Sequence, residues 1–196
     1  MSTKLIVGLG NPEQRFDLTR HNIGFAIVDS FADVCNLKDG LLRTNDDLAP
    51  LKVKYGIIDN EHTVIVLKPQ DWINNSGFAV WRARKALRLK PKDIMVVHDD
   101  MDFDFGKVRI KPGGSSGRHN GVGDIIKYCT NKIVRFRIGV GRPLGKKSSR
   151  DHVLSEFNSQ EQRVFPSLYN LTSDAIHSYV VHGVQQTMNK INRKVD

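Results

Sequence analysis

The chain has 196 residues, of which 39% are hydrophobic and 26% charged, a composition typical of a folded, water-soluble domain. Its apolar runs are shorter than the roughly 18 residues that cross a membrane, which excludes a membrane-spanning protein. Two cysteines are too few for a disulfide-stabilised scaffold, and no Cys/His metal spacing surrounds them. We therefore expect a reducing compartment, either the cytoplasm or, in a eukaryote, the mitochondrial matrix, since no signal or transit segment precedes the first apolar run.

The formal net charge of +9 is unevenly distributed. Residues 107–150 include twelve Lys or Arg and a single acid, Asp124, so this segment carries +11 and the rest of the chain −2. One strongly basic quarter indicates an anionic partner, with nucleic acid as the leading candidate. A basic surface that serves only solubility is the equally simple alternative.

The first half of the chain alternates between apolar runs and helical patterns. The run at 5–9 predicts a buried strand, and apolar residues recurring every three or four positions over 23–34 predict a helix. Two further strands are expected at 53–58 and 63–67, joined by a short turn. A helix with a basic outer face is expected at about 77–89.

The second half continues the alternation. A buried strand is expected at 94–97, a half-exposed strand at 107–111, a short helix at about 121–128 and a strand at 134–140. The segments between them are rich in glycine, serine and basic residues, which predicts loops. The tail is expected to be helical with one apolar face, and Pro166 should kink or break its earlier part.

Strands alternating with helices predict an α/β fold: a mixed, mostly parallel twisted sheet with helices on both faces and a helical C-terminal tail. No internal repeat or linker is visible, so residues 1–196 are expected to form a single domain. In such sheets, ligand sites lie beyond the carboxyl ends of the strands. The polar segments expected at this edge are 10–12, 19–22, 68–77, 98–100 and 118–121.

His21 and Asp99 are the members of this set best suited to catalysis. An imidazole titrates near neutral pH, so His21 is a candidate general base, and Asp99 is able to hold its tautomer and favour the imidazolium. The asparagine amides position water or polarise a carbonyl. No serine or cysteine occupies a nucleophile motif, so the expected nucleophile is activated water. In the alternative interpretation, Asn22 and residues 74–76 only cap helices and turns.

In order and separation, these motifs resemble those of the bacterial-type peptidyl-tRNA hydrolase family. The resemblance extends over nearly the whole chain. Its motifs are Val7-Gly8-Leu9-Gly10-Asn11-Pro12, Thr19-Arg20-His21-Asn22, Asn74-x-Ser76-Gly77, His98-Asp99-Asp100, His119-Asn120-Gly121 and Arg137-Ile138-Gly139. It implies an α/β enzyme that cleaves the ester between a peptide and the 3′ end of tRNA, without a metal or other cofactor. We expect a monomer whose partner is peptidyl-tRNA and which does not bind membranes.

The resemblance also implies roles for individual residues. His21 is the expected catalytic base, Asp99 its orienting carboxylate, and Asn11 the residue that holds water or the peptide carbonyl and helps to reject a free α-amino group. Lys111 and Arg137 match positions that clamp a terminal phosphate of the tRNA, and both belong to the basic segment. The expected substrate-binding residues are Phe16, Trp72, Asn74 and Asn120.

The sequence departs from the usual family pattern at several positions. The departures are Glu13 for a glycine, Phe16 for a tyrosine, Ile73 for a methionine, Asp100-Met101 for a Glu-Leu pair, and Ser115, Ser116 and Arg118 in a loop that is mostly glycine. None of them removes an expected catalytic residue. They concern loop mobility and substrate specificity, and they are consistent with a divergent or organellar member of the family.

Other functions fit the motifs less well. Gly8 and Gly10 begin a dinucleotide-binding pattern, but Glu13 occupies the place of its third glycine. His119 is expected to support the Asn120 loop and not to act as a second base. The serious alternative is a catalytically weak RNA-binding or splicing-partner protein on the same fold, as in relatives from plant organelles. The survival of every expected catalytic residue favours the enzyme.

Overall fold

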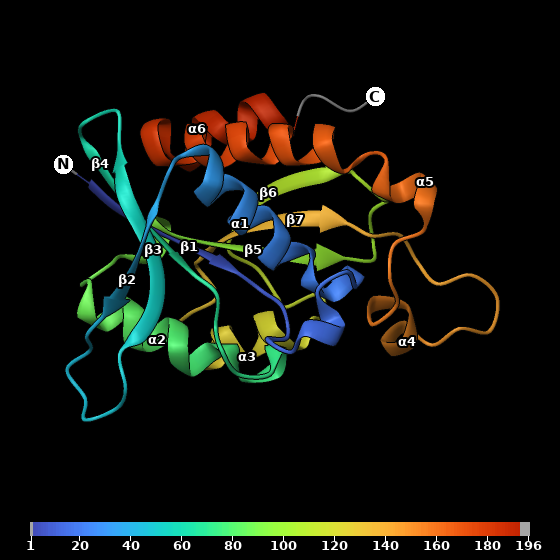
Figure 1. Ribbon diagram of the computed structural model, residues 1–196, viewed down its shortest axis with the longest axis horizontal. Helices are drawn as coiled ribbons and strands as arrows, with labels where there is room; N and C mark the ends of the chain where they lie inside the picture. The colour runs from blue at the N-terminus through green and yellow to red at the C-terminus, as the bar shows by residue number, and fades with distance from the viewer. Residues whose placement is uncertain (1, 193–196) are drawn as a thin grey trace.

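The computed structural model describes residues 2–192, which form a seven-stranded mixed sheet between two layers of helices (Figure 1). The strands are β1 (Ser2–Gly8), β2 (Lys38–Leu42), β3 (Leu51–Ile58), β4 (His62–Leu67), β5 (Ile94–Asp100), β6 (Val108–Pro112) and β7 (Val134–Gly139). Their order across the sheet is β2-β3-β4-β1-β5-β7-β6. Only β3 and β6 run against the other five, so the predicted mixed, mostly parallel sheet is confirmed.

Helices cover both faces of this sheet. In Figure 1, α6 lies along the top and α2 and α3 along the bottom. The α-helices are α1 (Ile23–Val34), α2 (Ser76–Ala86), α3 (Asn120–Tyr128), α4 (Ser149–Val153), α5 (Ser159–Gln162) and α6 (Phe165–Ile191). Single 3-10 turns are η1 (Gln14–Phe16), η2 (Arg20–Asn22), η3 (Ile73–Asn75) and η4 (Pro91–Asp93). None of the helices in this part of the chain combines the length and apolar character needed to cross a bilayer.

The central strand β1 is a continuous apolar run because its side chains are buried on both faces of the sheet. Leu5 and Val7 pack into one core with α2 and α3, whereas Ile6 packs into the other core with α1 and α6. Successive side chains of a strand point to opposite faces of the sheet. Because both faces are covered by helices, every inner position of β1 is apolar. This burial fixes the strand whose carboxyl end carries Asn11.

The structure differs from the sequence-based expectations in two elements. The edge strand β2 was not predicted, because its side chains are mostly exposed and show no alternation of apolar and polar residues. The helical tail is interrupted just before Pro166, since α5 ends at Gln162 and α6 begins at Phe165, but Pro166 does not kink a helix. Pro166 lies in the first turn of α6, where its missing N–H would have no partner within the helix. The kink in α6 is at Gly183, with φ 79° and ψ 177°.

Four adjacent parallel strands, β4, β1, β5 and β7, bring their carboxyl ends to one edge of the sheet. The chain leaves β1 through α1 on one face, and it leaves β4 through α2 on the other. The edge next to β1 is therefore a topological switch point, where α/β sheets form their ligand sites. The polar segments that follow these strands meet there.

Candidate active site

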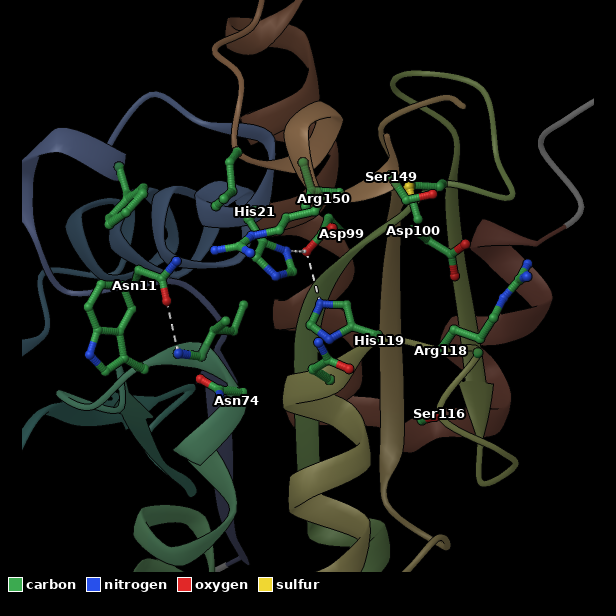
Figure 2. Close-up of a pocket in the computed structure, with 18 of the residues that line it drawn as sticks. Asn11, His21, Asn74, Asp99, Asp100, Ser116, Arg118, His119, Ser149 and Arg150 are labelled. Atoms are coloured by element: carbon green, nitrogen blue, oxygen red, sulfur yellow. Dashed lines mark hydrogen bonds and ion pairs between the residues drawn. The ribbon is translucent and has the colours of Figure 1, made fainter. Parts of the chain in front are cut away.

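A cleft of about 690 Å³ opens at the carboxyl ends of the parallel strands (Figure 2). Its wall includes seven residues that the sequence analysis singled out: Asn11, Phe16, His21, Trp72, Asn74, Asp99 and Asn120. One wall of the cleft was not expected from the sequence: it is formed by α4 and the residue after it, which contribute Ser149, Arg150, Val153 and Leu154. A five-residue helix inside a basic loop is too short to show apolar periodicity, and the signal that could have marked it is the capping pattern Ser148-x-x-Asp151, in which Ser148 caps the helix start.

Asp99 lies at the centre of the cleft between two histidines. Its Oδ1 is 2.8 Å from Nδ1 of His21 and 2.9 Å from Nε2 of His119. An ionised carboxylate has no proton to donate, so both of these ring nitrogens are donors. In neutral His21 the other nitrogen, Nε2, then carries a free lone pair. Nε2 of His21 is thus free to accept a proton.

His119 is held in one tautomer by its second hydrogen bond. Its Nδ1 accepts from the backbone N–H of Val122 at 3.3 Å, which caps the start of α3. An accepting Nδ1 places the proton of the neutral ring on Nε2, the atom that faces Asp99. Both ring nitrogens of His119 are therefore engaged in hydrogen bonds that position Asp99 and the Asn120 helix start.

The charges of this cluster shift the pKa values of its members. Burial raises the pKa of Asp99, but the charges and hydrogen bonds of His21 and His119 outweigh burial, so the net shift is downward. Burial lowers the pKa of His21, whereas the charge of Asp99 and its hydrogen bond raise it, and the net shift from 6.5 is upward. The pair therefore combines an ionised carboxylate with an imidazole that binds a proton readily.

Next to this pair, His98 is kept neutral. Its Nδ1 donates to the backbone oxygen of Asp99 at 2.8 Å, and its Nε2 is buried without a hydrogen-bond partner. Complete burial is the main cause that lowers the pKa of His98 to about 3. A neutral ring at this position packs edge-on against His119, with ring centroids 4.9 Å apart.

Asn11 is buried, and its side-chain orientation is fixed. Its Oδ1 accepts from the backbone N–H of Ile73 at 2.9 Å, a contact drawn in Figure 2. The side chain of Asn22 bonds both the backbone N–H and the carbonyl of Asn11, each at 2.9 Å. The alternative in which Asn22 caps α1 is therefore wrong, since its side chain makes no cap hydrogen bond. With Oδ1 engaged, Asn11 offers its Nδ2 donor to the cleft.

The expected substrate-binding residues lie along the same opening. Phe16 and Trp72 meet edge to face, with centroids 5.8 Å apart and planes at 71°, and Trp72 is 44% exposed. Asn74 is in η3, Asn120 begins α3, and both are exposed. The opening thus presents two aromatic rings and two amides to a ligand.

The expected phosphate clamp lies beside the cleft, on the ladder between β6 and β7. The register places Arg109 opposite Arg137 and Lys111 opposite Arg135, so all four cations share one face. Lys111 and Arg137 are diagonal neighbours on that face. Arg137 donates from Nε to Asp100 at 2.6 Å. Arg135 is buried and donates to the backbone oxygens of the glycine-rich loop at 114 and 115.

The His21–Asp99–His119 cluster has three possible metal-ligand atoms within 4.8 Å of one another. Their fit to a metal ion is poor, because Nδ1 of His21 and Nε2 of His119 both carry protons that Asp99 accepts. To bind a metal, His119 would move its proton to Nδ1, where it would oppose the N–H of Val122. The cluster is arranged to hold and transfer protons.

A histidine hydrogen-bonded to a buried carboxylate, at the switch point of an α/β sheet, is an arrangement typical of hydrolytic enzymes. A family model described as peptidyl-tRNA hydrolase matches residues 5–196, and the chain belongs to this family. Curated relatives named peptidyl-tRNA hydrolase include that of Persephonella marina, 35% identical over 98% of both chains. That of Chloroflexus aggregans is 38% identical over 96% of this chain and 98% of its own.

Solved structures agree with this assignment. A crystal structure of peptidyl-tRNA hydrolase in complex with n-propanol superposes with a TM-score of 0.87 at 34% identity, over 97% of this chain and 95% of the other. The enzyme from Acinetobacter baumannii superposes with a TM-score of 0.81 at 37% identity, with the same coverage. The family resemblance predicted from the motifs is confirmed.

Proposed function

We propose that this protein hydrolyses the ester bond between a peptide, or an N-blocked amino acid, and the 3′ end of tRNA. This reaction recycles tRNA from prematurely released peptidyl-tRNA. One observation carries the proposal: in a member of the peptidyl-tRNA hydrolase family, His21 is hydrogen-bonded to a buried carboxylate at 2.8 Å inside an open cleft. That geometry supports base-catalysed attack of water on an ester.

In the proposed mechanism His21 works through Nε2, because its Nδ1–H is donated to Asp99. Nε2 takes one proton from water as the water oxygen bonds to the ester carbonyl carbon. The C–O bond to the tRNA then breaks, and the proton on Nε2 passes to the departing 3′ oxygen. Between these steps the carboxylate of Asp99 stabilises the imidazolium.

Asn11 is proposed to hold the substrate's peptide carbonyl through its Nδ2 donor. The orientation of the amide supports this role, since its Oδ1 is engaged by the backbone of Ile73. A peptide carbonyl accepts from Nδ2, whereas a free α-ammonium group has no lone pair to offer. Asn11 therefore favours peptidyl-tRNA over aminoacyl-tRNA. We assign the rest of the peptide to the rings of Phe16 and Trp72, and the ester-bearing end to Asn74 and Asn120.

Lys111 and Arg137 are proposed to bind the terminal phosphate of the tRNA. Their diagonal placement on one face of the β6–β7 ladder supports a two-point grip, and Asp100 holds the Arg137 guanidinium in place. Lys111→Ala and Arg137→Ala should each raise KM for peptidyl-tRNA, with kcat unchanged. Each should also lower the slope of log KM against log salt concentration by about one, the value for one lost phosphate contact. Lys146→Ala and Lys147→Ala are the matched controls. Equal effects in all four variants would mean that Lys111 and Arg137 contribute only general positive charge and do not form a specific phosphate site.

The alternative function, a catalytically weak RNA-binding or splicing-partner protein, is not favoured. The family model and the relatives described above are named for the hydrolase. We further propose a monomer, which is what the family resemblance implies. Cys35 and Cys129 are free thiols, which suits a reducing compartment such as the cytoplasm.

The deciding experiment is a steady-state assay of N-acetylated amino acid released from charged tRNA. The parent protein should release it, and His21→Ala should do so about 10²- to 10⁴-fold more slowly while tRNA binding is largely kept. If His21→Ala turned over nearly as fast as the parent, His21 would not be the general base. Absence of turnover by the parent, with RNA binding retained, would instead support the binding protein.

A further inference from the structure

Two arginines that line the cleft have no role in the proposed mechanism. Arg118 comes from the glycine-rich loop after β6, and Arg150 comes from α4. Neither forms an ion pair with a carboxylate within the described residues 2–192. A third arginine of the cleft, Arg15, does form one, at 2.9 Å from Glu13.

The acids at the rim are not available to neutralise these two arginines. Asp100 is held by Arg137 at 2.6 Å, and Asp102 is held by Arg142 at 2.7 Å. The carboxylate of Asp99 is occupied by the two histidines. The mouth of the cleft therefore carries two arginines that have no salt-bridge partner among residues 2–192.

The backbone of Arg118 is unusual for an arginine. Its φ is +66°, in the left-handed region that favours glycine. The other non-glycine residues with positive φ are mostly Asn or Asp, which tolerate this region, or lie just after a helix, as Arg88 does. Glycine would satisfy the turn at lower conformational cost. A strained position that presents an exposed guanidinium to a cleft points to a functional use of that side chain.

The two arginines flank the catalytic cluster. Arg118 directly precedes His119, which donates to Asp99 at 2.9 Å. Figure 2 shows the side chain of Arg150 extending from α4 across the cleft, with Arg118 on the other side of His119. A chain-like ligand whose reactive bond lies at His21 would pass between them.

We propose that Arg118 and Arg150 form a second phosphate-binding pair, which holds backbone phosphates of the single-stranded 3′ end of the substrate RNA on either side of His21 and Asp99. The inference rests on the proposed function. Guanidinium groups bind phosphate oxygens in a bidentate fashion, and their charge is independent of pH in the working range. Both residues belong to the segment 107–150 with its net charge of +11, which favours RNA over an acidic peptide as the bound anion.

The test combines kinetics on N-acetylated aminoacyl-tRNA with binding of a fluorescein-labelled single-stranded RNA of the tRNA 3′-end sequence. Arg118→Ala and Arg150→Ala should each raise KM about 3- to 10-fold, with kcat within about twofold. Each should lower the slope of log Kd against log salt for the labelled RNA by about 0.7, the value for one lost contact to a single strand. Lys146→Ala and Lys147→Ala remove the same charge from an exposed loop outside the cleft and should change neither quantity.

Two further variants separate charge from backbone strain. Arg118→Lys should restore part of the affinity, because it keeps the charge but not the two-pronged geometry. Arg118→Gly should bind RNA as weakly as Arg118→Ala but melt at a higher temperature, because glycine relieves the positive φ. Salt slopes equal to the parent's in Arg118→Ala and Arg150→Ala would overturn the proposal. Because the RNA-binding arm needs no turnover, an inactive parent would defeat the proposed function without deciding this one.

Discussion

His21 and His119 donate to the same atom, Oδ1 of Asp99, at 2.8 and 2.9 Å. This shared acceptor fixes the position of the carboxylate from two sides and leaves Nε2 of His21 free. Because His119 is itself hydrogen-bonded to the backbone of α3, the position of Asp99, and with it that of His21, is fixed by the fold. The relationship explains why the pKa of His21 rises despite its burial.

The raised pKa of His21 should be visible in the pH dependence of kcat/KM. A base must be unprotonated to work, so the acidic limb of the kcat/KM profile of the parent should lie above pH 6.5, the ordinary pKa of histidine. Asp99→Asn removes the charge that raises the pKa of His21, so this limb should move to lower pH. The plateau rate should also fall, though less than in His21→Ala. A profile measured from pH 5 to 9 checks both, and an unmoved limb would show that Asp99 does not set the pKa of His21.

His98 should make the fold sensitive to mild acid. Its folded pKa is about 3 against 6.5 when unfolded, so below pH 6.5 the unfolded chain binds one more proton than the folded chain. The contribution of His98 to stability is complete above pH 6.5 and should fall by about 1.4 kcal/mol per pH unit as pH decreases toward 3. His21 acts in the opposite sense, because its raised pKa adds stability below pH 6.5 that is lost as pH rises through its folded value.

The measurement is urea unfolding of the parent and of His98→Asn between pH 4.5 and 6.5, where every other titrating group is common to the two proteins. Asparagine is able to keep the hydrogen bond to the backbone oxygen of Asp99 but does not titrate. The free energy of unfolding of His98→Asn should therefore vary less with pH than that of the parent. Parallel curves for the two proteins would mean that His98 takes up its proton without unfolding.

Asn11→Asp should weaken the discrimination against aminoacyl-tRNA. One carboxylate oxygen is able to accept from the N–H of Ile73 as Oδ1 of Asn11 does, and the other then faces the cleft. That oxygen repels a peptide carbonyl and attracts a free α-ammonium group. The ratio of kcat/KM for N-acetylated over free aminoacyl-tRNA should fall about tenfold or more, since one such charge interaction is worth at least about 1.4 kcal/mol. An unchanged ratio would assign discrimination to another residue.

Arg20 should stabilise the wall of the cleft through Glu161. Its Nη2 donates to both carboxylate oxygens of Glu161, at 2.8 and 2.6 Å, and its Nη1 donates to the backbone at Glu156. The pair is largely buried, with side chains 8% and 16% exposed. These contacts join the turn that carries His21 to the segment just after α4. Arg20→Leu should lower the free energy of unfolding by about 3 kcal/mol, because it leaves a mostly buried carboxylate without its partner.

Two variants control this prediction. Glu161→Gln keeps the capping box with Asn158 but loses the ion pair, so its effect isolates the charge. The double variant Arg20→Leu/Glu161→Gln removes both charges, so its loss should be smaller than the sum of the losses in Arg20→Leu and Glu161→Gln. Urea unfolding and KM are measured for each variant. Additive losses would show that the two side chains are not coupled.

The sequence alone determined the core and the chemistry of this protein. The apolar run of β1 and the period of α1 follow from burial, which constrains residue type directly. His21 and Asp99 were predicted as base and orienting carboxylate because few side chains are able to do this chemistry, and their motifs keep a fixed order along the chain. The structure brings the two within hydrogen-bond distance.

Only the tertiary structure decided which atoms meet. Nothing local reveals that His119 shares the oxygen that binds His21, that Asn22 bridges the backbone of Asn11, or that α4 supplies Arg150 to the cleft. These contacts join residues distant in the sequence, and their geometry depends on how the strands order around β1. The edge strand β2 and the kink at Gly183 escaped prediction for a related reason, since exposed side chains and a single glycine leave no periodic pattern. Burial is recorded residue by residue in the sequence, whereas a contact between distant segments is set by the packing of the whole sheet.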